Sequence, residues 1–309
     1  MAVRYDNVIV FGPTGAVGGA AAVEAGKRGA KVWLAMRDTD KVVDGIPDEQ
    51  ERNGRFVRVK ADLSDPETVK QAVQLSGAKA AFVYLIHDPT GIKGACQAMK
   101  EAGIEYVVFL SSFTLTEGAS LREMTPEDMI PYMHAQGEVA LEDISMAHTA
   151  LRPGFFASNP FKLHMDASKT PYEFYAFSEG KQTFDNIVPT DIGRVAGAVL
   201  VDPPSTSSKE VIYLYGPTLM SELEMYKTIK DGFSKEVKVV QQTPEKWTER
   251  MKAAGIPPAV VQSLIWAQDE HGPKFYSGSI PARGAANIKK YSGYEPTSFE
   301  DFVKSYGDK

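Results

Sequence analysis

The chain has 309 residues, of which 43% are hydrophobic, and a formal net charge of −6 at pH 7. This hydrophobic content is ample for a packed core and excludes a disordered chain. The negative charge and the lack of any run of five or six basic residues argue against nucleic acid as a partner, because binding to a phosphate backbone would work against the overall field.

Cysteine and histidine usage excludes two further classes. Cys96 is the single cysteine, so the chain forms no internal disulfide and no cysteine-based metal site, and the five histidines show no ligand spacing. We therefore expect no metal. The N-terminal residues run directly into the first predicted strand, which leaves no room for a signal peptide, and no apolar run reaches about 18 residues. A cytoplasmic protein that does not contact membranes is the expectation.

A glycine-rich turn comes first in the chain. The apolar run 8–11 leads into Gly12, and further glycines follow at 15 and 18, before an Ala-rich helical pattern over 16–28. Gly12 permits a sharp turn, Gly15 lets backbone N–H groups approach a pyrophosphate, and Gly18 lets the helix pack closely on the sheet. The helix also directs its partly positive N-terminus at the same anion. The spacing predicts a dinucleotide site, with a plain turn as the alternative.

Strands and helices alternate through the rest of the first half. Strands are predicted at 31–36, 55–59, 80–86, 106–110 and 149–151, and helices at 66–75, 91–102 and 126–146. Strands separated by helices of about 10 to 20 residues form right-handed βαβ units, so this order predicts an α/β protein with a doubly wound parallel (Rossmann) sheet. We expect residues 1–153 to form an NADP-binding Rossmann domain.

The end of the second strand indicates which nicotinamide cofactor is bound. NAD sites place an acidic residue there to hold the ribose 2′-OH, whereas this chain has Arg37 followed by Asp38. Arg37 offers a forked, charged donor set to a 2′-phosphate, and Lys41 adds a second positive charge. NADP(H) is therefore favoured, and NAD is the alternative if Asp38 lies at the ribose instead.

Two more candidate positions follow strand ends. Asp62, which precedes Leu63 after the third strand, is placed to accept a hydrogen bond from the adenine amino group, or else belongs to a helix N-cap region. His87 follows the fourth strand beside the nicotinamide half of the site, with an ordinary loop histidine as the alternative.

The chain changes character after residue 153. Residues 154–189 are loop-rich and aromatic, and they are followed by predicted helices at 191–200, 221–231, 244–254 and 258–268 and strands at 211–215 and 237–240. The second half has too few predicted strands to form a separate globular domain easily. We therefore expect residues 154–309 to form a smaller mixed α/β substrate lobe, with some segments returning to the main sheet. Phe155, Asn159, Phe174 and Phe177 are candidate substrate contacts, or else ordinary lobe core.

Several motifs together resemble the NmrA-like branch of the atypical short-chain dehydrogenase/reductase superfamily, over nearly the whole chain. They are the loop from Gly12 to Gly18, Arg37, Asp62-Leu63, Phe109-Leu110-Ser111-Ser112, Gln136-Gly137-Glu138-Val139, Leu151 to Phe156 with Asn159, Val188 to Gly193, and Tyr215-Gly216-Pro217. Asp191, in the motif from Val188 to Gly193, is expected to cap or anchor a helix of the lobe.

The resemblance implies hydride-transfer chemistry by a serine, a tyrosine and a lysine four residues beyond the tyrosine. Ser111 or Ser112 and Tyr132 match the first two positions, whereas Gln136 stands where the lysine is expected. Glutamine can hydrogen-bond a ribose but cannot stabilise a tyrosinate, so alcohol oxidation is disfavoured. Reduction suffers less, because neutral Tyr132 can still donate a proton, as can His134 or His87. A surface role for Tyr132 stays open.

The resemblance also implies that the turn after the sixth strand closes over the nicotinamide, with a backbone N–H for its carboxamide. The expected cofactor-binding residues are Gly12, Thr14, Gly15, Ala16, Val17, Gly18, Arg37, Lys41, Asp62, Leu63, His87, Gln136, Pro153, Phe155 and Phe156.

The leading interpretation is an NADP(H)-dependent oxidoreductase acting on a hydrophobic aromatic or polycyclic small molecule of secondary metabolism. An NADP(H)-sensing regulatory protein without redox activity is the first alternative, because the lysine is missing. A non-redox isomerase or cyclase on the same scaffold is the second. The helix from Pro126 is long enough to mediate a homodimer, although its sequence does not require one.

Overall fold

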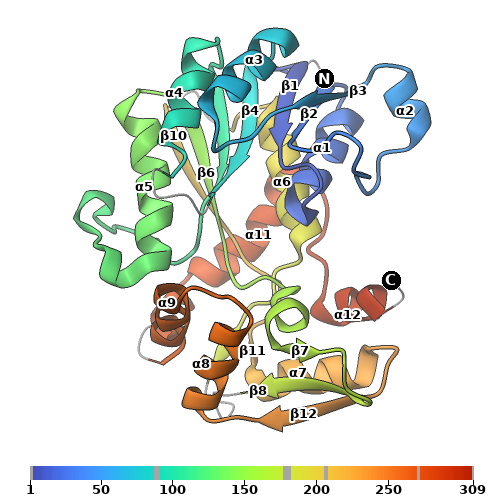
Figure 1. The fold of residues 1–309 in the computed structure, drawn as a ribbon, viewed down its shortest axis with the longest axis vertical. Helices are drawn as coiled ribbons and strands as arrows, with labels where there is room; N and C mark the ends of the chain where they lie inside the picture. The colour runs from blue at the N-terminus through green and yellow to red at the C-terminus, as the bar shows by residue number, and fades with distance from the viewer. Residues whose placement is uncertain (1–2, 87–90, 177–181, 205–207, 270–271, 308–309) are drawn as a thin grey trace.

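A computed structural model shows an α/β protein built around one parallel sheet (Figure 1). The structure describes residues 3–86, 91–176, 182–204, 208–269 and 272–307. Within these ranges the main sheet has seven strands in the order β10-β6-β5-β4-β1-β2-β3, and every neighbouring pair is parallel. The strands are β1 (Asn7–Phe11), β2 (Lys31–Met36), β3 (Phe56–Lys60), β4 (Ala80–Tyr84), β5 (Tyr106–Leu110), β6 (Ala147–Pro153) and β10 (Lys209–Leu214). The Rossmann fold predicted from the alternating pattern is confirmed.

Helices cover both faces of this sheet. The apolar side chains of α1, α6 and α11 pack on one face, and those of α3, α4 and α5 pack on the other. These helices are α1 (Ala16–Lys27), α3 (Pro66–Ser76), α4 (Lys93–Glu101), α5 (Met129–Asp143), α6 (Pro189–Val201) and α11 (Ile280–Ser292), and a short α2 (Asp48–Arg52) precedes β3. The strands are buried on both faces, which explains their nearly continuous apolar sequences.

Close helix contact holds α6 against α1. A Cβ added at Gly193 would lie 2.4 Å from the Cβ of Ala20, so a larger residue there would force the two helices apart. Asp191, in the first turn of α6, accepts hydrogen bonds from the backbone N and the Oγ1 of Thr297 at 2.6 and 3.0 Å. Asp191 thus anchors a helix as expected, but that helix packs on the main sheet and not in the lobe.

The second half of the chain contributes both to the main sheet and to a lobe beneath it (Figure 1). The lobe contains a three-stranded sheet in the order β12-β8-β7 and a two-stranded sheet β11-β9. Its elements are η3 (Pro160–His164), β7 (Met165–Asp166), β8 (Tyr172–Ala176), β9 (Thr183–Phe184), β11 (Met220–Ser221), α7 (Glu222–Gly232), β12 (Val237–Gln241), α8 (Pro244–Ala253), α9 (Pro258–Asp269), α10 (Gly272–Phe275) and α12 (Phe299–Gly307). Strand β10 and helices α6 and α11, by contrast, pack with the main sheet.

Three sequence-based expectations need correction. Strand β8 lies within the segment that we expected to be loop, and it pairs in parallel with β12, which is distant in sequence. Helices α11 and α12 were not predicted. The helix expected at 126–146 is divided into a short 3-10 turn, η2 (Pro126–Asp128), and α5; a second such turn, η1 (Leu121–Glu123), precedes it.

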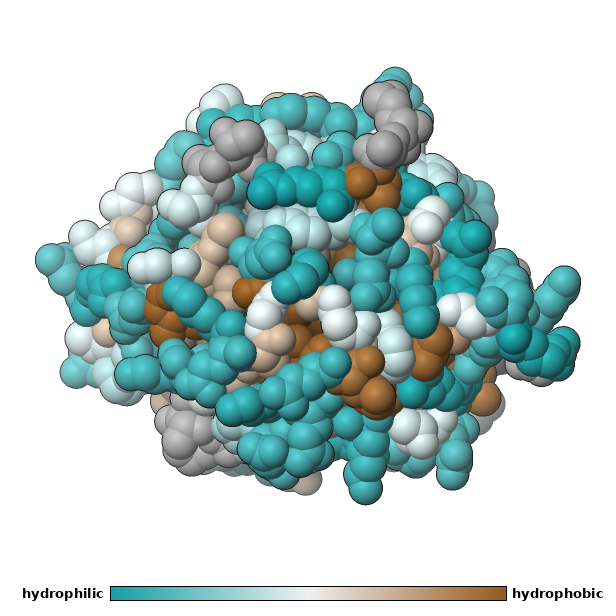
Figure 2. All heavy atoms as spheres, turned by 90° about the horizontal axis from the view of Figure 1, so that it is seen from above, coloured by the Kyte–Doolittle hydropathy of each residue, from teal (hydrophilic) through white to brown (hydrophobic). Residues whose placement is uncertain are grey.

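The surface at the end of the molecule opposite the lobe is mainly hydrophilic, with apolar side chains interspersed in small groups (Figure 2). In the described part of the chain, no helix is both long and apolar enough to cross a bilayer.

Candidate functional site

The glycine loop lies where the sheet order reverses direction. Strands β1 and β4 are neighbours, and the chain proceeds from β1 to β2 on one side and from β4 to β5 on the other. Ligands of open parallel sheets bind outside the carboxyl ends of the strands at such a switch point. Gly12 directly follows β1, so the loop is at this position.

The three glycines fit the roles expected of them. Gly12 has a φ of +68°, a left-handed conformation that favours glycine, and its amide donates to the carbonyl of Ala35 at 3.0 Å. A Cβ at Gly18 would lie 2.3 Å from the carbonyl oxygen of Gly12, so only glycine lets α1 pack on the turn. Gly15 is exposed and is the N-cap of α1 without a side-chain cap. The first-turn amides of α1 are therefore available to an anion.

The other loop residues divide by exposure. Thr14 and Ala16 are exposed with Gly15, whereas the side chain of Val17 is buried in the core beneath the loop. Any contact of Val17 with a cofactor is thus made by its backbone.

Arg37 extends from the end of β2 as an exposed side chain, and it forms no ion pair with any described residue. Asp38, the competing residue, uses Oδ1 to accept from the backbone N of Asp40 at 3.0 Å. Arg58 stabilises the following turn by donating hydrogen bonds to the carbonyls of Thr39 and Lys41. The Lys41 side chain is exposed. The geometry thus leaves the Arg37 guanidinium available and ties Asp38 to its own turn.

Asp62 follows β3 and caps a turn. Its Oδ1 accepts from the backbone N and the hydroxyl of Ser64 at 3.0 and 2.8 Å, and the Ser64 amide is the main reason that the pKa of Asp62 is below its ordinary value. The helix N-cap is Asp65 rather than Asp62. Leu63 is 5% exposed and packs in the core, so only its backbone can contact a ligand.

Tyr84, the last residue of β4, was not predicted as a site residue. A Cβ placed on Gly12 would lie 2.5 Å from Tyr84 Cε1, so the ring rests against the first glycine of the loop. The side chain is also close enough to Arg37 and Asp62 for both charges to influence its pKa. The sequence signal that could have identified Tyr84 was its position as an aromatic residue at the end of the predicted fourth strand.

Ser111 and Ser112 follow β5 and differ in their partners. The Ser111 hydroxyl donates to Glu138 Oε1 at 2.7 Å, and both residues are buried. The Ser112 hydroxyl accepts from the backbone N and the Oγ1 of Thr114 at 3.2 and 2.9 Å, which leaves its own proton for another acceptor. The structure thus distinguishes the two adjacent serines by their hydrogen-bond partners, which the sequence alone could not do.

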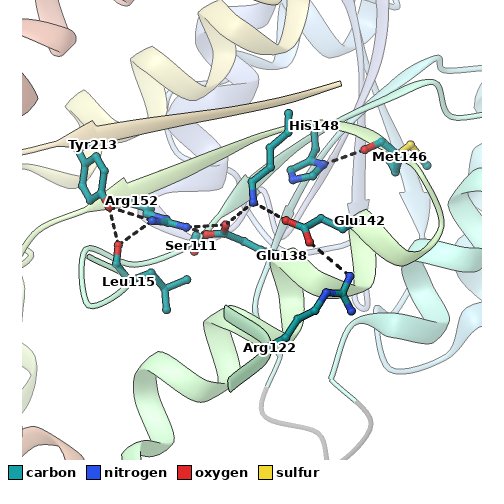
Figure 3. Close-up of polar contacts among 10 residues, drawn as sticks. Ser111, Leu115, Arg122, Glu138, Glu142, Met146, His148, Arg152 and Tyr213 are labelled. Carbon is teal, nitrogen blue, oxygen red and sulfur yellow. Dashed lines mark hydrogen bonds and ion pairs between the residues drawn. The ribbon is translucent and has the colours of Figure 1, made fainter. Parts of the chain in front are cut away.

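Ser111 belongs to a buried polar network between α5 and the edge of the main sheet (Figure 3). Arg152 donates from Nε and Nη2 to the two carboxylate oxygens of Glu138 at 2.9 and 2.8 Å, and from Nη1 to the Leu115 carbonyl and the Tyr213 hydroxyl. Burial opposes the ionisation of Glu138, but the bonds and charge of Arg152 outweigh it, so the pKa of Glu138 lies below its ordinary value. The network fixes the start of the loop after β5.

Helix α5 carries the remaining predicted chemistry. Tyr132 lies in its first turn and is half-buried, and Gln136 lies one turn later with an exposed side chain. His134 is half-buried, with its ring 6.5 Å from that of Phe109. The backbone N of Ile130 donates to the hydroxyl of Ser263 on α9, so the lobe contacts the start of this helix. No described contact joins Tyr132 to either serine.

The turn after β6 is held by a buried carboxylate. Asp185 is 1% exposed and accepts from the backbone N of Phe155 at 2.7 Å, the backbone N of Gly216 at 2.9 Å and the hydroxyl of Tyr276 at 2.8 Å. Burial raises the pKa of Asp185 to about 6. The amide of Phe155 is thus engaged within the protein, as is that of Gly154, which donates to Leu214.

The predicted substrate residues lie in different surroundings. Phe155 and Asn159 are half-buried, and the Phe155 ring lies 4.5 Å from that of Phe184. Of the cofactor contacts expected nearby, Phe156 packs on the core of the main sheet and Pro153 is buried at the end of β6. Phe174 is fully buried in the lobe core, as its alternative interpretation held. His87 and Phe177 lie outside the described residues.

A small cavity of about 180 Å³ opens near the loop after β5. Its lining comes from that loop, η2, the start of α5 and α10, and it consists of Thr114, Thr116, Met124, Asp128, Pro131, Lys274 and Phe275. The cavity is smaller than the roughly 300–1,000 Å³ typical of ligand pockets in enzymes. Thr114 connects it to Ser112.

Comparison with known proteins identifies the family. A family model described as NAD(P)H-binding matches residues 12–203. The nitrogen metabolite regulation-like protein bik4 of Gibberella fujikuroi is 38% identical over 320 residues, which cover 97% of this chain and 96% of that protein. The chain belongs to the NmrA-like group of NAD(P)H-binding proteins.

Solved structures confirm the fold of this NmrA-like protein. The NADPH-dependent quinone oxidoreductase QOR2 of Escherichia coli, complexed with NADPH, has 15% identity and a TM-score of 0.68. The Citrobacter sp. triphenylmethane reductase complexed with NADP(H) has 14% identity and the same TM-score. Each alignment covers 97% of this chain and 99% of the other.

Proposed function

We propose that this NmrA-like protein is an NADP(H)-dependent reductase of hydrophobic aromatic or polycyclic small molecules. Residues 1–153 hold the nucleotide, and residues 154–309 contribute the substrate lobe. The observation that carries the cofactor assignment is Arg37, whose exposed guanidinium forms no ion pair with any described residue while Asp38 is bound to its own turn. A 2′-phosphate is the complement of such a group.

The residues present fit a dinucleotide. The left-handed Gly12, the tightly packed Gly18 and the uncapped start of α1 form a turn suited to an anion, and a Cβ at Gly12 or Gly18 would clash with the protein around it. When bound, the nicotinamide supplies a hydride to the substrate. Ser112 is the better candidate to hydrogen-bond the substrate oxygen, because the hydroxyl of Ser111 is already donated to Glu138. Tyr132 is the proposed proton donor, and Gln136 holds the ribose without charge.

The substrate class rests on the aromatic character of the lobe and on the reactions for which two structural neighbours are named. Phe155 is half-buried in the turn after β6, next to the expected nicotinamide position. Two structurally similar proteins are named for quinone and triphenylmethane reduction, both of which involve aromatic substrates. Aromatic intermediates of secondary metabolism are the class that we propose.

An NADP(H)-sensing regulatory protein is the second candidate. It is favoured by Gln136, which is exposed and uncharged where a catalytic lysine is expected, and by the similarity to bik4, whose name refers to nitrogen metabolite regulation. Both functions require nucleotide binding, and they differ in whether the bound NADPH is consumed.

Two measurements test the proposal. Calorimetry should show binding of NADPH in preference to NADH. The absorbance of NADPH should then fall in the presence of naphthoquinones or triphenylmethane dyes, with stoichiometric formation of the reduced compound. Binding without consumption for the whole panel would favour the sensor, product without consumption would favour an isomerase or cyclase, and no binding of either nucleotide would refute the cofactor assignment.

A further inference from the structure

Tyr84 is placed in the nucleotide crevice rather than in the core. It ends β4, the strand beside β1 at the switch point, and its ring lies against Gly12, where an added Cβ would come within 2.5 Å of Cε1. The residue is 36% exposed, although the preceding strand residues are buried. One side of the ring thus packs on the phosphate-binding turn, and part of it stays open to a ligand.

The charged residues that influence Tyr84 lie on the adenosine side of the crevice. Burial is the main cause that raises the pKa of its hydroxyl, Arg37 opposes that rise, and Asp62 adds to it. Arg37 follows β2 and Asp62 follows β3, so both lie on the adenosine side of the switch point. The hydroxyl is protonated at neutral pH and can donate a hydrogen bond.

Nothing in the described protein uses that donor. No described residue accepts a hydrogen bond from the Tyr84 hydroxyl, and no described residue pairs with Arg37. Asp62, the nearby carboxylate, accepts from Ser64 instead. The Tyr84 hydroxyl and the Arg37 guanidinium are therefore within electrostatic reach of each other on the adenosine side of the crevice, and neither has an acceptor among the described residues.

We infer that Tyr84 is a second determinant of NADP(H) recognition, with its ring against the adenosine and its hydroxyl donating to the 2′-phosphate bound by Arg37. The inference rests on the proposed preference for NADP(H). A hydrogen bond to a charged phosphate strengthens binding more than one to a neutral acceptor, so losing the hydroxyl should weaken NADPH binding about 10-fold. NADH lacks that phosphate and should be unaffected by the same loss.

The test compares Tyr84→Phe, Tyr84→Ala and the wild type by calorimetry with NADPH and with NADH. Tyr294→Phe is the matched control, because Tyr294 is equally exposed at 36% and packs against Arg194 rather than the glycine loop. We expect Tyr84→Phe to lose about 10-fold in NADPH affinity with unchanged NADH affinity, Tyr84→Ala to weaken both, and Tyr294→Phe to match the wild type.

Each other outcome has a distinct meaning. If the wild type prefers NADPH and Tyr84→Phe keeps that ratio, the role of Tyr84 is overturned alone. If Tyr84→Ala binds either nucleotide more tightly than the wild type, the ring obstructs the site and the inference fails. If the wild type shows no preference for NADPH, the proposed cofactor selectivity falls and the inference falls with it. Tyr84→Phe keeps the ring and so remains informative even if Tyr84→Ala fails to fold.

Discussion

Replacing Glu138 with glutamine should strongly destabilise the fold, because it leaves the Arg152 guanidinium buried without a counter-charge. The side chains of Arg152 and Glu138 are 6% and 0% exposed, and two N–H···O bonds of 2.9 and 2.8 Å join them. A glutamine retains one acceptor oxygen and turns its NH₂ group toward the guanidinium. Breaking a buried pair by removing one partner costs about 3–5 kcal/mol.

The magnitude can be separated from a general packing effect by a double variant. Arg152→Met combined with Glu138→Gln removes the stranded charge, so it should recover at least about 1 kcal/mol relative to Glu138→Gln alone. At about 2.1 cal/mol/K of unfolding entropy per residue, each kcal/mol corresponds to about 1.5 °C in a chain of this length, so Glu138→Gln should lower the melting temperature by about 5–8 °C. Lys227→Gln, which breaks an exposed pair with Asp231 on α7, is the control and should melt close to the wild type.

The pH dependence gives a second readout of the same pair. The folded-state pKa of Glu138 is depressed, so its contribution to stability is complete above the pKa of an unfolded glutamate and is lost as the pH falls through the folded value. The difference in melting temperature between wild type and Glu138→Gln should therefore shrink in acid, below about pH 4. A loss under about 1 kcal/mol at neutral pH, or a double variant less stable than Glu138→Gln, would refute this account of the network.

Three further predictions follow from the site. Arg37→Asp should weaken NADPH binding by about 3 kcal/mol, roughly 100-fold, through lost charge-assisted bonds and added repulsion, and calorimetry with unchanged NADPH affinity would show that the adenosine end is misplaced. Ser112→Ala should lower the turnover of an aromatic substrate by about 100-fold, whereas Ser111→Ala should mainly lower the melting temperature. Both variants are measured by kinetic and thermal assays, and the reverse pattern would show that the two serines have exchanged roles. Burial raises the pKa of Asp185 to about 6, above that of an unfolded aspartate, so its contribution to stability falls as the pH rises from about 4 to about 6. The difference in melting temperature between the wild type and Asp185→Asn should therefore change across that pH range. A constant difference would contradict the raised pKa.

The main sheet could be predicted because its signals are local. Each strand is a short apolar run followed by a helix, and Gly12 and Gly18 adopt the turn and the close packing that their spacing suggests. Strand β8 could not be predicted in the same way, because it has no alternating pattern and gains its hydrogen bonds from β12, more than sixty residues later in the chain. Its pairing is a property of the packed lobe, not of residues 172–176 alone.

The chemistry of the site shows the same limit more sharply. Ser111 and Ser112 are identical neighbours in sequence, and only the approach of α5 to β5 brings Glu138 within 2.7 Å of the first of them. Glu138 in turn tolerates burial because Arg152, on the adjacent strand β6, meets both of its oxygens. Sequence spacing places a serine after the fifth strand, but the tertiary charge pair decides which hydroxyl is already occupied. The pair of Glu138 and Arg152 also holds the loop that begins at Ser111, so a variant that breaks the pair should disturb the position of Ser112 as well. Loss of activity in Glu138→Gln would then reflect displacement of Ser112, not a direct role of Glu138 in the reaction.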